Sequence, residues 1–201
     1  MDAETLKRAI FHTHTRRLGH VAEEMIRRLH PHFQKPLNKY HDLYDPGLKM
    51  RVEVKFSTVR RKSPPLNGDG GVLASLLKEM DADRAVRFEE WKNVPFTCNI
   101  QQVKKAEFDV LYYGLFFDDV VKVFKALPGR LDGVVDYCEK QHKGNHGEGQ
   151  FHITDKNLQV HLDSFLENTL SYQDVLGLLA TEDREPDANP PPKRCRVQGR
   201  A

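Results

Sequence analysis

Hydrophobic and polar residues alternate along the chain in two different periods, which predicts both helices and strands. Apolar residues recur at helical spacing over residues 6–29, and shorter helical patterns cover residues 72–80, 158–169 and 172–180. The last pattern is preceded by Ser171-x-x-Asp174, the spacing of a capping box. The helices are therefore expected at both ends of the chain and in its middle, with other structure between them.

Strand-like patterns lie between these helices. Residues 39–59 predict a β-hairpin with Pro46-Gly47 at its turn. Residues 108–117 are almost all apolar or aromatic, as expected of a central strand buried on both faces, and residues 120–127 follow as a partner strand. Glycines and polar side chains in residues 142–152 are typical of a loop. We expect an α/β (α+β) fold with a mixed central sheet flanked by helices.

Length and composition divide the chain into two parts. A chain of 201 residues is expected to form one compact domain with an appendage, and residues 1–180 carry all the patterns above. Residues 181–201 contain four prolines and almost no large apolar side chains, which predicts a disordered, Pro-rich basic tail. The tail segment Lys193-Arg194-Cys195-Arg196 is compatible with a nuclear-targeting signal, which would place the protein in the nucleus.

The compartment is predicted from what the sequence lacks. No window approaches the roughly 18 consecutive apolar residues of a membrane span, and the N-terminal residues lack the apolar stretch of a signal peptide. Cys98, Cys138 and Cys195 are too few and too scattered for a disulfide framework. We therefore expect an intracellular protein in a reducing compartment, with no membrane partner.

Charge is distributed unevenly, although the formal net charge is only +2. Residues 1–65 hold fourteen Lys and Arg against seven Asp and Glu, whereas the remainder of the chain is net acidic. Such asymmetry is typical of a protein with a face for a polyanion, and nucleic acid is the usual candidate. An ordinary solvated surface would produce the same composition.

The hairpin carries the most informative side chains. In its second strand, Glu53 and Lys55 lie on one face because side chains alternate with a period of two. If Pro46-Gly47 is a two-residue loop, Asp42 shares that face and Asp45 lies on the other; a loop longer by one residue would reverse the two aspartates. Asp42 is the first candidate and Asp45 the alternative.

Two carboxylates and an ammonium group in this arrangement suit a hard divalent cation. Mg²⁺ binds oxygen ligands, usually one or two carboxylates completed by water and substrate phosphate, and Mn²⁺ is expected to substitute for it. Asp42 and Glu53 are the candidate metal ligands. Lys55 is expected to orient the attacking water, or to take its proton if its pKa is lowered.

These residues resemble a known family. Asp42-x10-Glu53-Val-Lys55, with a turn between, is similar to the active-site hairpin of the PD-(D/E)XK nuclease superfamily, which includes most type II restriction endonucleases. Gly19-x-x-Ala-Glu23 resembles the first-helix glutamate of that family, and residues 108–112 resemble the strand after its middle helix. The resemblance covers residues 19–124 and departs from the family in that no proline precedes Asp42.

The resemblance implies a restriction-endonuclease-like core, a nuclease domain over residues 1–180, and catalytic roles for Asp42, Glu53, Lys55 and Glu23. The expected activity is that of a Mg²⁺-dependent DNA endonuclease, a hydrolase of the sequence-specific type II restriction class. Its expected partners are double-stranded DNA and a second copy of the chain, because a homodimer matches a palindromic site. The alternatives are a repair or junction-resolving nuclease of the same fold and a non-catalytic nucleic-acid-binding protein.

Further residues are candidates for contacts with DNA. Three consecutive cations follow the second hairpin strand, and three polar or basic residues lie in the 142–152 loop: Arg60, Arg61, Lys62, Lys143, Asn145 and Gln150. Zinc binding by the cysteine and histidines at positions 138, 142, 146 and 152 is disfavoured by their spacing. The sequence has neither a Walker A motif nor a Rossmann glycine pattern, so no nucleotide cofactor is expected.

Overall fold

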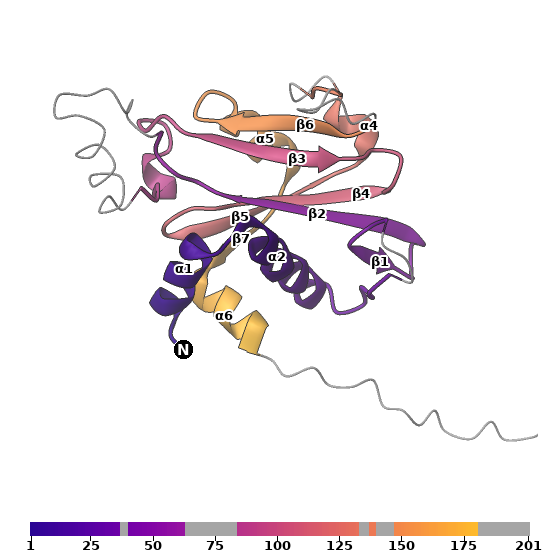
Figure 1. Ribbon diagram of the computed structural model, residues 1–201, viewed down its shortest axis with the longest axis horizontal. Helices are drawn as coiled ribbons and strands as arrows, with labels where there is room; N and C mark the ends of the chain where they lie inside the picture. The colour runs from indigo at the N-terminus through magenta and orange to yellow at the C-terminus, as the bar shows by residue number, and fades with distance from the viewer. Residues whose placement is uncertain (37–39, 63–83, 133–136, 140–146, 181–201) are drawn as a thin grey trace, which may run out of the picture.

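The computed structural model describes residues 1–36, 40–62, 84–132, 137–139 and 147–180 (Figure 1). Its centre is a five-stranded mixed sheet with the strand order β1-β2-β4-β5-β7. Strands β2 and β4 run parallel, and the other neighbours run antiparallel. The strands are β1 (Leu43–Asp45), β2 (Met50–Thr58), β4 (Val110–Phe116), β5 (Val120–Ala126) and β7 (Leu166–Ser171). The predicted mixed sheet is confirmed.

Helices cover one face of this sheet (Figure 1). They are α1 (Ala3–His12), α2 (Thr15–Leu29) and α6 (Tyr172–Ala180). Ala22, Met25 and Ile26 of α2 are fully buried in a core that also contains Val52 and Tyr112 of the sheet. The apolar stripe of α2 is therefore the side that holds the helix on the sheet, and its polar side faces outward.

A second layer covers the opposite face of the sheet. It consists of the antiparallel pair β3 (Thr97–Val103) and β6 (Gly149–Thr154), with helix α5 (Leu158–Phe165) beside them. The short helices η1 (Phe88–Glu90) and α4 (Pro128–Leu131) connect elements on this side. Phe96 and Phe151 of this layer pack with Leu111, Tyr113 and Phe124 of the sheet. The sheet thus lies between two hydrophobic cores.

The predicted central strand is confirmed as β4, in which all seven residues are buried. The predicted partner strand is confirmed as β5. The capping box before α6 is also present, since the Ser171 N–H donates to Asp174 Oδ2 at 2.8 Å and the Asp174 N–H donates to Ser171 Oγ at 3.1 Å. These elements were predictable because their local sequence preference and their packing agree.

Two helix predictions were wrong in their extent. The helical pattern over residues 6–29 is divided into α1 and α2, because Thr13 and His14 adopt extended backbone conformations. The predicted helix over residues 158–169 ends at Phe165, where the chain enters β7 and pairs with β5. In the second case, pairing with the sheet overrides a weak local preference.

The outer strand pair was not predicted. The sequence analysis assigned no strand to residues 97–103 and assigned residues 142–152 to a loop, but β6 begins at Gly149 and pairs with β3. Phe151 and Ile153 alternate inward along β6 and are fully buried. Glycines and polar residues immediately before β6 concealed this alternation.

Helix α2 also holds the end of α6. Arg28 Nη1 donates hydrogen bonds to the carbonyl oxygens of Leu178 and Leu179 at 3.0 and 3.2 Å. Glu24 accepts from both Arg27 and Arg28, so one carboxylate orients the two guanidinium groups. The last carbonyl groups of α6, which lack partners within their own helix, are satisfied in this way.

Several predictions lie outside the described residues. They are the helix over residues 72–80, the tail over residues 181–201, and the candidate contacts Lys143 and Asn145. In the described part of the chain, no helix is both long and apolar enough to cross a membrane.

Candidate active site

The β1-β2 hairpin determines which residues meet at the candidate site. Leu43 pairs with Val52, and the Asp42 N–H donates to the Val52 carbonyl oxygen at 3.1 Å, so Asp42 lies across from Glu53. The predicted two-residue loop was wrong, because four residues, Pro46 to Lys49, connect the pair Asp45–Met50. A change of two residues preserves the alternation of faces, so Asp42 still shares the face of Glu53.

Asp45 explains the longer turn. Its Oδ1 accepts hydrogen bonds from the backbone N–H groups of Gly47 at 2.9 Å and Leu48 at 3.1 Å. Lys49 then adopts a left-handed conformation, with φ of 55°. An aspartate that bonds to the backbone two and three residues later is a common way to build a turn. Asp45, the alternative ligand, is buried in this structural role and faces His32 at 3.6 Å.

Asp42, Glu53 and Lys55 are brought into direct contact. Asp42 Oδ2 accepts a hydrogen bond from the Val54 N–H at 2.8 Å, which fixes the carboxylate against the edge of β2. Lys55 Nζ lies 3.5 Å from the same oxygen and forms a close ion pair with Glu53 Oε1. The ammonium group therefore sits between the two carboxylates.

Burial and charge alter the protonation of Glu53. Removal from water is the main cause that raises the pKa of Glu53, the Lys55 ammonium group lowers it, and the neighbouring Asp42 carboxylate raises it; together they bring the pKa to about 7. Only 11% of the Glu53 side chain is exposed. Near neutral pH this carboxyl group is thus poised between its acid and its carboxylate form.

The pKa of Lys55 shifts in the direction opposite to the one that a base requires. Burial alone would lower its pKa, but the charges of Asp42 and Glu53 outweigh burial and raise the pKa above its ordinary value. Lys55 therefore keeps its proton at neutral pH. A lowered pKa that would let Lys55 take a proton from water is therefore excluded. The other predicted role, orienting the attacking water, is compatible with a protonated lysine.

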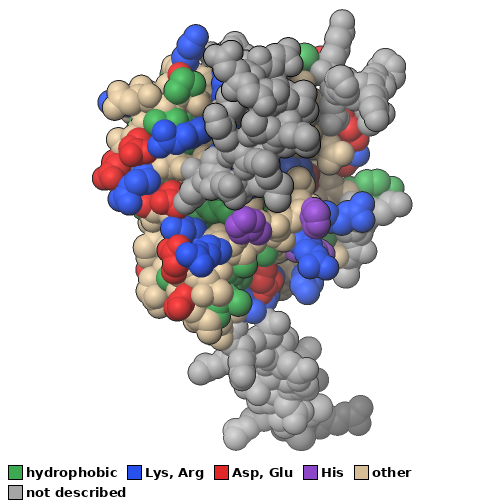
Figure 2. Space-filling model, turned by 60° about the vertical axis from the view of Figure 1, so that its left-hand side comes forward, with side chains coloured by type: hydrophobic (Ala, Val, Ile, Leu, Met, Phe, Trp, Pro, Cys, Tyr) green, Lys and Arg blue, Asp and Glu red, His purple; other side chains and the backbone are tan. Residues whose placement is uncertain are grey.

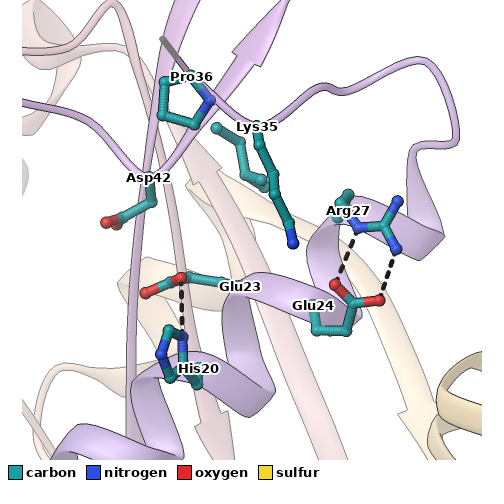
Figure 3. Close-up of a pocket in the computed structure, with 8 residues that line it drawn as sticks. His20, Glu23, Glu24, Arg27, Lys35, Pro36 and Asp42 are labelled. Atoms are coloured by element: carbon teal, nitrogen blue, oxygen red, sulfur yellow. Dashed lines mark hydrogen bonds and ion pairs between the residues drawn. The ribbon is translucent and has the colours of Figure 1, made fainter. Parts of the chain in front are cut away.

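Glu23 faces the same region from α2. It lines a cavity of about 560 Å³ together with Asp42, and the two carboxylates point into the same space in Figure 3. Burial raises the pKa of Glu23, and the Asp42 charge adds to this effect. His20, one helical turn earlier, lies within 3.3 Å of the Glu23 carboxylate. The sequence analysis did not single out His20, although its i,i+3 spacing from Glu23 is a usable signal.

The start of β2 is anchored by a residue pair that the sequence analysis also missed. Arg51 binds Asp109 through two guanidinium nitrogens at 2.9 and 3.0 Å, and the Arg51 N–H donates to the same carboxylate at 2.8 Å. The Arg51 charge helps lower the pKa of Asp109, chiefly through this hydrogen bonding. These bonds hold β2 in register with β4 two residues before Glu53.

The predicted contacts with DNA are only partly available in the described residues. Arg60 donates to the Phe11 carbonyl oxygen, and Arg61 pairs with Glu90 at 3.1 Å, so both guanidinium groups already have protein partners. Lys62 is exposed. Gln150 Oε1 accepts from Asn99 Nδ2 at 3.3 Å on the outer strand pair.

Basic residues do not gather into one patch on the face seen in Figure 2. There, the coloured Lys and Arg side chains are interspersed with Asp and Glu side chains. The uneven charge along the sequence is therefore not a continuous basic surface in this view.

The donor atoms of the site fit a hard divalent cation. Asp42 and Glu53 offer carboxylate oxygens, and burial of Glu53 makes a compensating positive charge favourable. Among the described residues, no group of three or more His, Cys, Asp or Glu side chains is arranged to enclose a metal ion. A site of two carboxylates completed by water and phosphate does not need such a group.

Comparison with family models, curated proteins and solved structures gives no match to this chain. The resemblance of the hairpin to a nuclease family therefore remains an expectation, and any functional argument rests on the geometry of the site.

Proposed function

We propose that the chain is a Mg²⁺-dependent endonuclease that hydrolyses phosphodiester bonds in double-stranded DNA, with a restriction-endonuclease-like core. The observation that carries the proposal is the contact of Asp42, Glu53 and Lys55 on one hairpin, with the Lys55 ammonium group held between the two carboxylates. A pair of carboxylates fixed beside a protonated lysine is suited to a reaction in which negative charge develops on phosphate.

Each residue has a role that follows from its surroundings. Asp42 and Glu53 would hold the cation, which supplies activation of water and compensation of phosphate charge when bound. Lys55 keeps its proton and donates a hydrogen bond to the attacking water or to a phosphate oxygen. Glu23, whose pKa is raised, accepts a proton more readily than an exposed glutamate would.

The sequence-specific type II restriction class stays part of the proposal, as does the homodimer that it requires. Of the loop candidates for contacts with phosphates or base edges, Gln150 is described, whereas Lys143 and Asn145 lie outside the described residues. Sequencing the ends produced from long unmethylated DNA distinguishes a specific enzyme, which gives discrete fragments, from a structure-specific or non-specific nuclease.

The test of the reaction uses two matched aspartate variants. Asp42→Asn keeps an oxygen to accept from Val54 but removes the charge, and Asp45→Asn does the same for the turn bonds to Gly47 and Leu48. We expect Asp42→Asn to lower the rate of plasmid cleavage with Mg²⁺ or Mn²⁺ by about a hundredfold or more, with Asp45→Asn close to wild type. Lys55→Ala should lose at least about a hundredfold as well.

Circular dichroism melting curves check that each variant is folded. Wild-type cleavage by Asp42→Asn would remove this carboxylate from the active site. A wild-type protein that shifts DNA in a gel but leaves it intact with both metals would establish the alternative, a non-catalytic nucleic-acid-binding protein.

A further inference from the structure

The cavity between α2 and the hairpin is lined by both acidic and basic side chains (Figure 3). Three carboxylates line it, those of Glu23, Glu24 and Asp42. The cations are Arg27 and Lys35. A volume of about 560 Å³ is within the range of roughly 300–1,000 Å³ that small-ligand pockets occupy. Such a space can take a single phosphate group of a DNA backbone that lies across its opening.

The two cations of this cavity differ in their availability. Arg27 Nε and Nη2 donate to the two carboxylate oxygens of Glu24 at 2.8 and 2.7 Å. This pairing is strong enough that the Arg27 hydrogen bond is the main cause lowering the pKa of Glu24 to about 2. Arg27 is therefore held by its own helix and forms part of the cavity wall.

Lys35 is held by no such partner. Its side chain extends into the cavity in Figure 3, and within the described residues no ion pair or side-chain hydrogen bond engages its ammonium group. Glu23 and Asp42 lie across the cavity from it and repel any anion that approaches them directly. An anionic group that enters the cavity is thus drawn to the Lys35 side.

We propose that Lys35 is a positioning residue that binds a backbone phosphate of the cleaved DNA strand, next to the phosphodiester at Asp42 and Glu53. This inference rests on the proposed nuclease function and adds one point on the path of the substrate strand, at the cavity between α2 and β1. A lysine binds phosphate as a point charge and reads no base, so the contact is independent of sequence.

The experiment compares Lys35→Ala with Lys35→Arg, and uses Lys156→Ala as the matched control. Lys156 is also exposed but lies in the turn between β6 and α5, away from the cavity. DNA binding is measured without divalent metal at several salt concentrations. Loss of one phosphate contact should make the slope of log affinity against log salt shallower by about 0.9. Lys35→Arg and Lys156→Ala should keep the wild-type slope.

Cleavage kinetics give a second readout. Lys35→Ala should raise KM about tenfold, with a much smaller effect on kcat, because the contact positions the strand and does not touch the reacting atoms. A merely structural role for Lys35 would lower the melting temperature and leave the salt slope unchanged.

The outcomes separate this inference from the proposed function. If the wild type cuts DNA but Lys35→Ala keeps its salt slope and KM, the inference is wrong and the nuclease assignment stands. If the salt slope of Lys35→Ala is shallower but the wild type never cuts DNA, the phosphate contact stands and the nuclease assignment is wrong.

Discussion

Glu53 links the candidate site to pH through the proton that it retains when buried. Its pKa in the folded protein is about 7, compared with 4.5 for an ordinary glutamate, and burial is the main cause. The folded state therefore binds this proton more tightly than the unfolded chain does. The contribution of this proton to the free energy of unfolding is complete below about pH 4.5. It is lost as the pH rises through about 7.

The form of Glu53 that binds a cation is the carboxylate, so metal affinity should follow the same titration in the opposite direction. We expect the affinity for Mn²⁺ to increase by about tenfold per pH unit up to about pH 7 and to level off above it. Calorimetric titrations at several pH values measure this directly. Glu53→Gln, which has no proton to lose, should abolish the steep region; a steep profile in that variant would assign the proton to another group.

At the scale of secondary structure, an aromatic ring of β2 packs over a position of β4 that lacks a side chain. Phe56 on β2 is paired with Gly114 on β4, and a Cβ atom at residue 114 would overlap with the Phe56 ring. Phe56 follows Lys55 directly along the strand. The glycine thus makes room for the ring of the residue that follows Lys55 on the same strand.

Gly114→Ala should therefore destabilise the protein by about 1–3 kcal/mol, since the ring must leave its preferred position. Urea unfolding measures the difference. The matched control is Gly177→Ala in α6, where an added Cβ meets nothing within 4 Å and the change should stabilise the helix by up to about 1 kcal/mol. Phe56→Leu in the Gly114→Ala background should recover part of the loss; no recovery would mean that the strain lies elsewhere.

The hairpin also shows what can be predicted of an element from sequence. The alternation of Glu53 and Lys55 with apolar residues places them on one face, and this survives any turn whose length changes by an even number. The turn length itself depends on hydrogen bonds from the Gly47 and Leu48 N–H groups to Asp45. The Pro-Gly pair alone does not predict these bonds. The face was therefore predictable, while the facing partner of each residue was not.

Over the whole molecule, the central sheet belongs to two cores at once. Val52, Val110 and Tyr112 face the helical layer, whereas Leu111 and Tyr113 face the outer strand pair. Adjacent residues of one strand thus contribute to opposite cores. Loss of either core exposes one full face of the same strands, so the two cannot be stable separately.

We therefore expect a single cooperative unfolding transition. Trp91, the only tryptophan in the chain, belongs to the core on the side of β3 and β6 and reports on that side by fluorescence. Helix α1, α2 and α6 signals in circular dichroism report mainly on the other side. The two melting curves should coincide. Midpoints that differ by several degrees would show that the layers unfold independently.

Sequence reasoning was most successful for features that repeat locally and least successful for contacts between distant segments. The buried strand β4 and the capping box at Ser171 were predicted from their own residues. The bond between Arg51 and Asp109 joins positions 58 residues apart, and Lys35 is a candidate only because folding places it in one cavity with Glu23 of α2 and Asp42 of the hairpin. No local period contains that information.

The bonds from Arg28 to the end of α6 have a practical consequence for experiments on this protein. Leu178 and Leu179 are hydrogen-bonded to the helix that carries Glu23. The end of α6 is therefore fixed relative to the cavity that Glu23 lines. A spin label or fluorophore attached at Ala180, which is exposed, would therefore follow any displacement of α2. The end of α6 thus offers a place from which to observe the candidate site without modifying it.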